Sequence, residues 1–589
     1  MPIDFTNINL VWTSILVETL SRLGLTTAII CPGSRSAPLA IAFAQHPKIE
    51  AIPVLDERSA AFFALGLARR LHRPVVLVCT SGTAGANFLP AVIEARISRV
   101  PLVVLTADRP PELRDCNAGQ AIDQQKLYGA FPNWYAELAI PALDPTLLAY
   151  GRQTMIQAWT RSQFPVAGPV HLNCPFREPL APQPDPQAQA LALTFRSEEF
   201  FAAVQPLPLP QGAIAAQSLP LAEWQSIPAG LIIAGPAQPA DPEGYGQAIA
   251  QLSRCLGYPV LAEGLSPLRN WQDHLPNLIT TYDLVLRNAT LAQKLVPQVV
   301  IRIGEMPTSK QLRTWLATHQ PRQWILDPAG VNLDPLHGPT IHIPVAVEAI
   351  AALLPKTAPP PSPYRHLWHT ADTQTRAAIQ HTMTQCDRLL ESKVAWILAH
   401  HLPAHTPLFI CNSTPIRDVE FFWMPGNSRI QPYCNRGANG IDGSLSTAIG
   451  MAHHQAPAVM LAGDLALLHD TNGFLLRQHF VGHLTIVLIN NNGGGIFEML
   501  PIARFDPPFE EFFAIPQTIN FAQLCQTYGV QHEQIHDWAT FIARLNPLPT
   551  TGIRVLEFQS DRKADAQWRQ NNLGTFAANI DIALPLYDY

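Results

Sequence analysis

Two polar residues that follow apolar runs could bind a divalent cation in the last third of the chain. Asp464 comes shortly after the apolar run 458–462, and Asn491 follows a second apolar run at 484–489. Asn491 lies 27 residues after Asp464, and three glycines follow closely behind it. Mg²⁺ prefers oxygen ligands and often completes its shell with phosphate oxygens. We therefore expect the carboxylate of Asp464, the amide oxygen of Asn491 and the carbonyl of Gly493 to bind a metal ion.

The elements around these residues form a strand–helix–strand unit. The runs 458–462 and 484–489 are expected to be short buried strands, and the segment 470–479 a helix between them. In an open parallel sheet the ends of both strands lie at the same edge, where ligands bind. Glycine would let the backbone come close to a diphosphate there. The alternative is that Asp464 caps a helix and that the Asn/Gly cluster is only a turn.

Length and composition restrict the class of protein. The 589 residues are enough for three or four domains of about 150 residues each. The chain is 47% hydrophobic and 14% charged, which indicates a globular protein, and its net charge of −6 argues against nucleic-acid binding. No apolar run approaches the roughly 18–20 residues of a membrane span, and the first ten residues, MPIDFTNINL, do not read as a secretion signal. Nine cysteines without paired spacing are typical of reduced thiols, so we expect a cytoplasmic protein.

Alternating strands and helices predict an α/β fold with three doubly wound parallel-sheet domains. We expect a first domain at 1–182, a central domain at 205–356 and a third domain at 364–589, with proline-rich linkers between them. A single long helix is expected at 370–400. The expected strands of the first two domains are 27–31, 49–55, 74–79, 101–106, 170–174, 230–234, 259–262, 299–303 and 324–326.

Three segments resemble one known enzyme family. Gly463-Asp464-Leu465, followed after a fixed gap by Asn490-Asn491, resembles the thiamine-diphosphate motif in the form that the menaquinone-pathway synthases carry. The segments PGSRSAPL at 32–39 and TADRPPEL at 106–113 are similar to signatures of the same synthases. The chain thus resembles this branch of the thiamine-diphosphate enzymes over both terminal thirds. The resemblance implies thiamine diphosphate and Mg²⁺ or Mn²⁺ as cofactors.

The same resemblance gives a role to Glu57, which begins an expected helix at 56–71 after a buried strand. Such a glutamate would hydrogen-bond N1′ of the cofactor pyrimidine and favour its imino tautomer, so that the 4′-nitrogen deprotonates C2 of the thiazolium. Read without the resemblance, Asp56 is a helix cap and Glu57 favours the helix dipole. Ile441 would support the bent cofactor; the alternative is an ordinary core residue. In this family Glu57 and the metal site of one centre come from different subunits, which implies a homodimer or a dimer of dimers.

Arginines in loops at strand ends indicate anionic ligands, because guanidinium groups bind carboxylates in bidentate fashion. Each arginine could instead form a structural salt bridge. The resemblance implies a transferase that decarboxylates 2-oxoglutarate and adds the succinyl unit to isochorismate by 1,4-addition; both substrates carry two carboxylates. The residues implied to hold carboxylates and hydroxyls are Ser34, Arg35, Arg109, Gln120, Lys310, Ser413, Arg417 and Arg436. The apolar wall that excludes water would consist of Ile496, Phe497 and Leu500.

Two positions depart from the family pattern. Some members have Arg where this chain has Asp123, and the family can show Lys-Arg where this chain has Lys310-Gln311. The role of Lys310 is therefore the least firmly supported by the resemblance.

Two other functions are compatible with parts of the sequence. Another thiamine-diphosphate lyase, such as an acetohydroxyacid synthase or a 2-oxoacid decarboxylase, would explain Glu57 and the metal motif but leave PGSRS and TADRPPEL without a role. An inactive scaffold protein would keep the fold alone, and the presence of Glu57, Asp464 and Asn491 together disfavours it.

Overall fold

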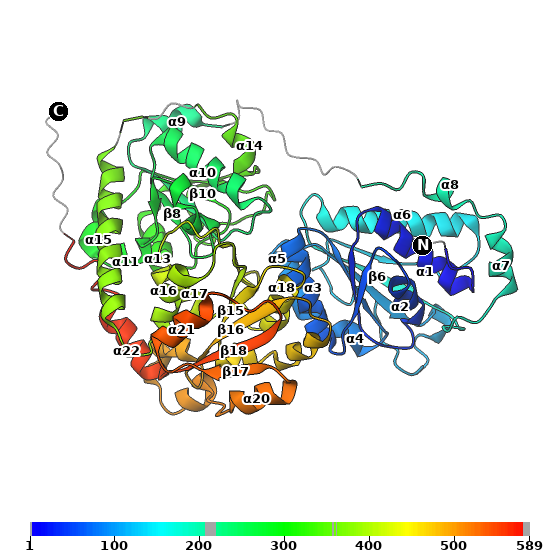
Figure 1. The fold of residues 1–589 in the computed structure, drawn as a ribbon. Helices are drawn as coiled ribbons and strands as arrows, with labels where there is room; N and C mark the ends of the chain where they lie inside the picture. The colour runs from blue at the N-terminus through cyan, green and yellow to red at the C-terminus, as the bar shows by residue number, and fades with distance from the viewer. Residues whose placement is uncertain (1–2, 207–218, 356–358, 361, 581–589) are drawn as a thin grey trace. The chain divides into compact units, whose positions relative to one another are not determined.

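The computed structural model describes residues 3–206, 219–355, 359–360 and 362–580. Within these ranges the chain forms three six-stranded sheets (Figure 1), and all strand pairings in them are parallel. The described chain divides into two compact units. The first contains one sheet and the second contains two. The predicted class, α/β with three parallel sheets, is confirmed.

The first unit consists of Met1–Pro210, Asn435–Gln455 and Ala466–Gly482. Its sheet has the order β2-β1-β3-β4-β6-β5. The strands are β1 (Thr27–Ile30), β2 (Glu50–Pro53), β3 (Val75–Cys79), β4 (Leu102–Asp108), β5 (Trp134–Glu137) and β6 (Pro169–Pro175). Five of them overlap the expected strands, and β5 was not predicted because this short half-buried strand has no apolar run.

The first unit contains a continuous hydrophobic core that includes Trp12, Phe43 and Val76. The helices of this unit are α1 (Ile8–Arg22), α2 (Ala37–Ala44), α3 (Glu57–Leu71), α4 (Thr83–Ala86), α5 (Leu89–Ile97), α6 (Pro145–Gln163), α7 (Pro186–Ala192), α8 (Ser197–Phe201) and α18 (Ser444–Ala452), with the 3-10 helices η1 (Pro111–Leu113) and η5 (Thr471–Gln478). The helix expected at 56–71 is α3, and its cap Asp56 accepts a hydrogen bond from the Ser59 amide. The helix expected at 470–479 is the 3-10 helix η5.

Helices α3 and α18 pack with their backbones in contact. A Cβ atom on Gly66 would lie 2.1 Å from the carbonyl oxygen of Thr447. A Cβ atom on Gly450 would lie 2.1 Å from the carbonyl oxygen of Phe63. Both positions therefore require glycine, because any side chain would push the two helices apart.

We expect Gly450→Ala to destabilise the protein by about 1–3 kcal/mol or more, since overpacking a closed contact forces the backbone to move. Calorimetric unfolding of the variant and the wild type checks this. Gly246→Ala is the matched control, because a Cβ atom there meets only Leu268 at the ordinary distance of 3.7 Å. Equal unfolding temperatures for Gly450→Ala and Gly246→Ala would contradict the close helix contact.

The second unit consists of Gln211–Cys434, Ala456–Leu465 and His483–Tyr589. Its middle sheet has the order β12-β11-β10-β7-β8-β9, and its C-terminal sheet the order β14-β13-β15-β16-β18-β17. The middle strands are β7 (Gly230–Ala234), β8 (Val260–Ala262), β9 (Leu278–Ile279), β10 (Val299–Ile303), β11 (Arg322–Leu326) and β12 (Thr340–Ile343). The C-terminal strands are β13 (Leu408–Ile410), β14 (Pro432–Tyr433), β15 (Ala458–Gly463), β16 (His483–Asn490), β17 (Gln531–Gln534) and β18 (Gly552–Gln559).

Two helices of the second unit, α15 (Pro363–Gln385) and α16 (Glu391–His401), correct a prediction. The other helices of this unit are α9 (Leu221–Ser226), α10 (Pro242–Leu256), α11 (Tyr282–Val285), α12 (Ala289–Lys294), α13 (Lys310–His319), α14 (Val347–Ala351), α17 (Thr414–Phe422), α20 (Phe521–Tyr528), α21 (Trp538–Leu545) and α22 (Arg562–Asn572); α19 (Asp464–Leu468) starts in this unit. The prediction of a single helix at 370–400 is wrong. The backbone of Cys386 is extended, and its carbonyl accepts a hydrogen bond from Lys393 Nζ at 2.6 Å. The helical conformation is therefore interrupted between α15 and α16.

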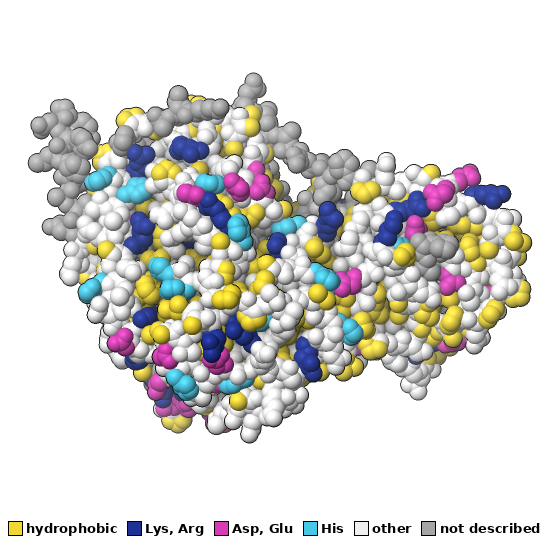
Figure 2. Space-filling model, in the orientation of Figure 1, with side chains coloured by type: hydrophobic (Ala, Val, Ile, Leu, Met, Phe, Trp, Pro, Cys, Tyr) yellow, Lys and Arg dark blue, Asp and Glu magenta, His cyan; other side chains and the backbone are white. Residues whose placement is uncertain are grey.

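The three sheets span 27–175, 230–343 and 408–559. The domain boundaries 1–182, 205–356 and 364–589 stay a prediction, and parts of both expected linkers lie outside the described residues. None of the described helices has the length and hydrophobicity that a bilayer span requires. None of the nine cysteines forms a disulfide among the described residues, and most are buried. On the face drawn in Figure 2, acidic and basic side chains are interspersed.

Candidate active site

Asp464 and Asn491 lie at the carboxyl ends of β15 and β16, which are neighbours in the C-terminal sheet. Their side chains are buried, with 4% and 7% of each residue exposed. The amide of Gly493 donates a hydrogen bond to Asp464 Oδ2 at 2.8 Å, so the turn after β16 folds back onto the aspartate. The structure thus brings the three predicted metal ligands together at one sheet edge.

The turn after β16 has a backbone that requires glycine at position 493. Gly493 has φ = +137°, and the preceding Asn492 has φ = +56°. A Cβ atom on Gly493 would lie 2.4 Å from the carbonyl oxygen of Ala514. The glycine therefore allows both the reversed backbone and the close approach of the segment that follows.

The oxygen atoms at this edge of the sheet are suitable ligands for a hard divalent cation. Asn491 Nδ2 donates to the Glu391 carboxylate, whereas Asn491 Oδ1 is buried and has no hydrogen-bond partner within the described ranges. Leaving a buried acceptor unpaired costs about 1–3 kcal/mol, which a bound cation would recover. Burial raises the pKa of Asp464 to about 6, and the charge of Glu391 contributes, although amide hydrogen bonds from Gly493 and Leu465 oppose the shift. A carboxylate and a free amide oxygen together suit Mg²⁺.

Glu57 is the first residue of α3 and is half-buried. Cys31 follows β1, and Cys79 is the last residue of the neighbouring strand β3. Burial raises the pKa of both thiols, and the charge of Glu57 raises it further, so the carboxylate lies near the carboxyl edge of this sheet. Ile441 is half-buried, and its carbonyl accepts a hydrogen bond from Ser444 Oγ at 2.9 Å.

Arg35 and Arg109 form a basic pair at the same edge of the first sheet. Arg35 Nη1 donates to the Phe176 carbonyl at 2.9 Å, and Arg35 Nη2 pairs with Glu178 at 3.2 Å. Burial lowers the pKa of Arg35, and the nearby charge of Arg109 lowers it further. The carboxylates of Glu178 and Asp108 oppose this shift. Ser34, which directly precedes Arg35, is exposed.

Ser81 is a residue that the sequence analysis missed. It is fully buried in the turn after β3. Arg109 Nη1 donates to its hydroxyl, and Gln120 Nε2 donates to its carbonyl at 2.9 Å. Its position at the end of a predicted strand, between Thr80 and Gly82, was the available signal. Ser81 thereby places two of the predicted substrate residues next to each other.

The loop after β4 lines a cavity of about 290 Å³. Asp108, Arg114 and Asp123 are among its lining residues. Asp108 is buried and pairs with Arg114 at 3.1 Å. Asp123 is exposed and accepts a hydrogen bond from the Gln125 amide at 2.9 Å. Asp123 therefore stabilises a turn of this loop.

Ser413 and Arg417 lie together at the start of α17 in the second unit. Arg417 Nη1 donates to the Ser413 carbonyl at 2.6 Å. Ser413 has φ = +75°, a conformation that non-glycine residues rarely adopt and that is typical of functional sites. Lys310 is the exposed first residue of α13 beside the middle sheet, and Arg436 is half-buried in the first unit.

The predicted apolar wall lies on the loop that follows the metal ligands. Ile496 and Phe497 are half-buried on the 3-10 helix η6 (Gly495–Met499), and Leu500 is 42% exposed. Arg562, which the sequence analysis missed, holds this loop: it donates to the Asn492 carbonyl at 3.0 Å and to Glu498 at 2.9 Å. The wall is therefore tied to the metal turn through one arginine.

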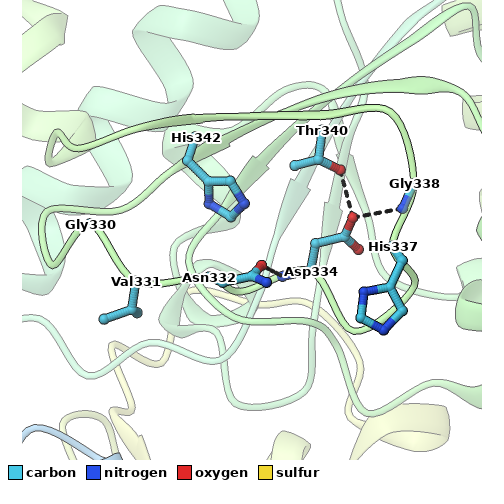
Figure 3. A pocket seen from close by; sticks show the side chains of 8 residues that line it. All are labelled: Gly330, Val331, Asn332, Asp334, His337, Gly338, Thr340 and His342. Carbon is cyan, nitrogen blue, oxygen red and sulfur yellow. Dashed lines mark hydrogen bonds between the residues drawn. The ribbon is translucent and has the colours of Figure 1, made fainter.

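A larger cavity of about 460 Å³ lies in the loop between β11 and β12 (Figure 3). Asp334 accepts hydrogen bonds there from the Gly338 amide at 2.8 Å and from Thr340 Oγ1 at 2.7 Å. Its carboxylate is thus occupied in holding the loop. This cavity shares no lining residue with the predicted site.

Glu50, His453 and His454 bring possible metal ligands within 4.8 Å of one another in the first unit. The Val481 amide, however, donates to His453 Nδ1 at 3.2 Å. The proton of the neutral ring therefore resides on Nε2, which faces Glu50 at 3.2 Å. A protonated ring nitrogen does not bind a cation, so these residues form a hydrogen-bonded cluster.

Comparison with known proteins defines the class of enzyme. Residues 12–127 match the model of the thiamine pyrophosphate enzyme N-terminal TPP binding domain, and residues 210–410 match that of the middle domain of thiamine pyrophosphate. The benzoylformate decarboxylase structure from Polynucleobacter necessarius matches with a TM-score of 0.65 at 17% identity, covering 93% of this chain and 98% of that one. The chain has the fold and the domains of a thiamine-pyrophosphate-dependent enzyme.

Three relatives named 2-succinyl-5-enolpyruvyl-6-hydroxy-3-cyclohexene-1-carboxylate synthase narrow this class. The protein of a Nostoc species is 60% identical over 98% of this chain and 100% of its own length. Those of Acaryochloris marina and Synechococcus elongatus are 59% and 55% identical, over 97% and 98% of this chain and 98% of each relative. The chain belongs to the family of 2-succinyl-5-enolpyruvyl-6-hydroxy-3-cyclohexene-1-carboxylate synthases, which confirms the resemblance seen in the sequence.

Proposed function

We propose that this protein decarboxylates 2-oxoglutarate and adds the succinyl unit to isochorismate by 1,4-addition, as a step of menaquinone or phylloquinone biosynthesis. The observation that carries the proposal is the identity of 55–60% to synthases of that name over nearly the whole chain. The buried donor set around Asp464 supports it, because a cation there would hold the diphosphate of the cofactor.

In this proposal the metal ion is Mg²⁺ or Mn²⁺, and its protein ligands are Asp464, Asn491 and the carbonyl of Gly493. When bound, thiamine diphosphate supplies the electron sink that the loss of CO₂ from a 2-oxo acid requires. Glu57 would hold a proton at N1′ of the pyrimidine, and Ile441 would pack against the cofactor. Each residue thus acts on a different part of one ligand.

The substrate carboxylates are assigned to the basic groups at the strand ends. Arg35 and Arg109 form one anion site, where Gln120 is positioned by Ser81. Ser34, Lys310, Ser413, Arg417 and Arg436 complete the polar contacts. Ile496, Phe497 and Leu500 exclude water, which favours carbon–carbon bond formation over protonation of the succinyl unit.

The family resemblance further supports a cytoplasmic homodimer or dimer of dimers in which each active centre combines residues of two subunits. Sedimentation equilibrium of the holoenzyme tests the assembly. A monomer that retains full activity would refute it.

Incubation of the protein with 2-oxoglutarate, isochorismate, thiamine diphosphate and Mg²⁺, followed by mass spectrometry, tests the proposed reaction. We expect the condensed cyclohexene product, and none without the cofactor. A 2-oxoacid decarboxylase would instead form succinic semialdehyde whether or not isochorismate is present. That outcome would replace the proposed function by the simpler lyase.

Arg417→Ala is expected to raise KM for at least one substrate about 10- to 100-fold, because a hydrogen bond to a charged group contributes about 1.5–3 kcal/mol. Steady-state kinetics with each substrate varied in turn measures it. Arg544→Ala is the control, since the Arg544 side chain forms an exposed ion pair with Glu533. Unchanged KM values for Arg417→Ala would make this arginine structural.

A further inference from the structure

We propose that Glu391 is a positioning residue that sets the direction of the Asn491 amide at the metal site. The proposal rests on the proposed function only in taking Asp464, Asn491 and Gly493 as the metal ligands. Glu391 is the first residue of α16, is 4% exposed, and lies 100 residues before Asn491 in the chain.

The Glu391 carboxylate decides which end of the Asn491 amide faces it. An ionised carboxylate only accepts hydrogen bonds, so the facing group must be the donor Nδ2. Asn491 Oδ1 then points to the other side, where it is buried without a hydrogen-bond partner among the described residues. The free oxygen is therefore directed away from Glu391 and is available to a cation.

A buried ion pair holds the Glu391 carboxylate in place. Arg569 on α22 donates from Nη2 to Glu391 Oε2 at 2.6 Å. The same guanidinium donates from Nη2 and Nε to Asp418 on α17, at 2.6 and 3.0 Å. Arg569 and Asp418 are each 3% exposed. Three helices of the second unit thus hold one carboxylate against the metal turn.

Loss of this carboxylate would remove the preference between the two ends of the amide. The oxygen and nitrogen of an asparagine amide have nearly the same shape, so only hydrogen bonds distinguish its two orientations. With the amide turned over, Nδ2 would face the cation and could not bind it. Residues that orient a metal ligand typically change metal affinity or activity 10- to 100-fold when they are replaced.

The test is the binding of Mn²⁺ and thiamine diphosphate to the cofactor-free full-length protein, by electron paramagnetic resonance and by titration calorimetry. Glu391→Gln is expected to weaken Mn²⁺-dependent binding about 10- to 100-fold. Asn491→Asp is also expected to weaken binding, because two carboxylates would then face each other. The double variant Glu391→Gln/Asn491→Asp is expected to recover most of the affinity, since the new amide can donate to the new carboxylate, whose other oxygen faces the cation.

Two further variants separate positioning from folding. Glu391→Asp keeps the charge beside Arg569 but withdraws it from Asn491. This variant should therefore fold like the wild type and yet bind Mn²⁺ more weakly than the wild type. Glu420→Gln changes another buried carboxylate, paired with Arg269 at 3.2 Å, and should leave Mn²⁺ affinity unchanged. Thermal unfolding of each variant verifies that it is folded.

The outcomes distinguish this inference from the proposed function. If the wild type takes up no thiamine diphosphate in the presence of Mn²⁺, the proposed function fails. If the wild type binds and folded Glu391→Gln or Glu391→Asp binds equally well, the positioning role is overturned. Absence of recovery in the folded double variant would likewise overturn it.

Discussion

Asp464→Ala is expected to weaken the Mg²⁺-dependent affinity for thiamine diphosphate by about 100-fold or more. Asp464 supplies the only charge among the three proposed protein ligands, and the replacement of residues that merely orient a ligand already costs about 10- to 100-fold. The substitution also leaves the Gly493 amide without its acceptor at 2.8 Å, so the metal turn loses its anchor. Titration calorimetry of the cofactor at fixed Mg²⁺ measures the effect.

The control for this prediction is Asp470→Asn. Asp470 is also a buried aspartate whose pKa burial raises to about 6, but its partner is Ser446 in the first unit. We expect cofactor affinity close to that of the wild type. Equal affinities of Asp464→Ala and the wild type would remove Asp464 from the metal site.

Glu57→Gln is expected to lower kcat about 10²- to 10⁴-fold, the usual contribution of a proton-transfer group, while cofactor affinity stays within a few-fold. Glutamine keeps the size of the side chain and can hydrogen-bond, but it cannot hold the proton at N1′ that the proposal requires. Steady-state kinetics combined with a cofactor titration separates the two effects.

Glu50→Gln is the matched control, because Glu50 begins β2 and contacts His453 and His454 away from the carboxyl edge of the sheet. We expect a kcat near that of the wild type. A normal kcat in Glu57→Gln would end the assignment of Glu57 as the activating acid.

The strands that could be predicted from the sequence are the buried ones. Strands such as β3 and β7 are buried at every residue, so they read as unbroken apolar runs. The edge strands β12 and β17 are largely exposed or half-buried and contain His, Thr, Gln and Glu, so no continuous apolar run marks them. Prediction therefore found the centre of each sheet better than its edges.

The metal ligands could be predicted because they are local to strand ends. Asp464 and Asn491 each follow a recognisable strand, and parallel pairing brings these ends together. Glu391 and Arg569 could not be found in this way, because their contact joins residues 178 positions apart on two different helices. Arg35 shows the same limit: a structural salt bridge and an anion site were posed as alternatives, and this side chain both pairs with Glu178 and lies beside Arg109.

The most direct test of the proposed reaction follows a ¹³C label at C2 of 2-oxoglutarate by nuclear magnetic resonance. With isochorismate, thiamine diphosphate and Mg²⁺ present, we expect the label to appear in a ketone carbon bonded to the ring of the product, with release of CO₂. Label found only in the aldehyde carbon of succinic semialdehyde, or unchanged 2-oxoglutarate, would contradict the account.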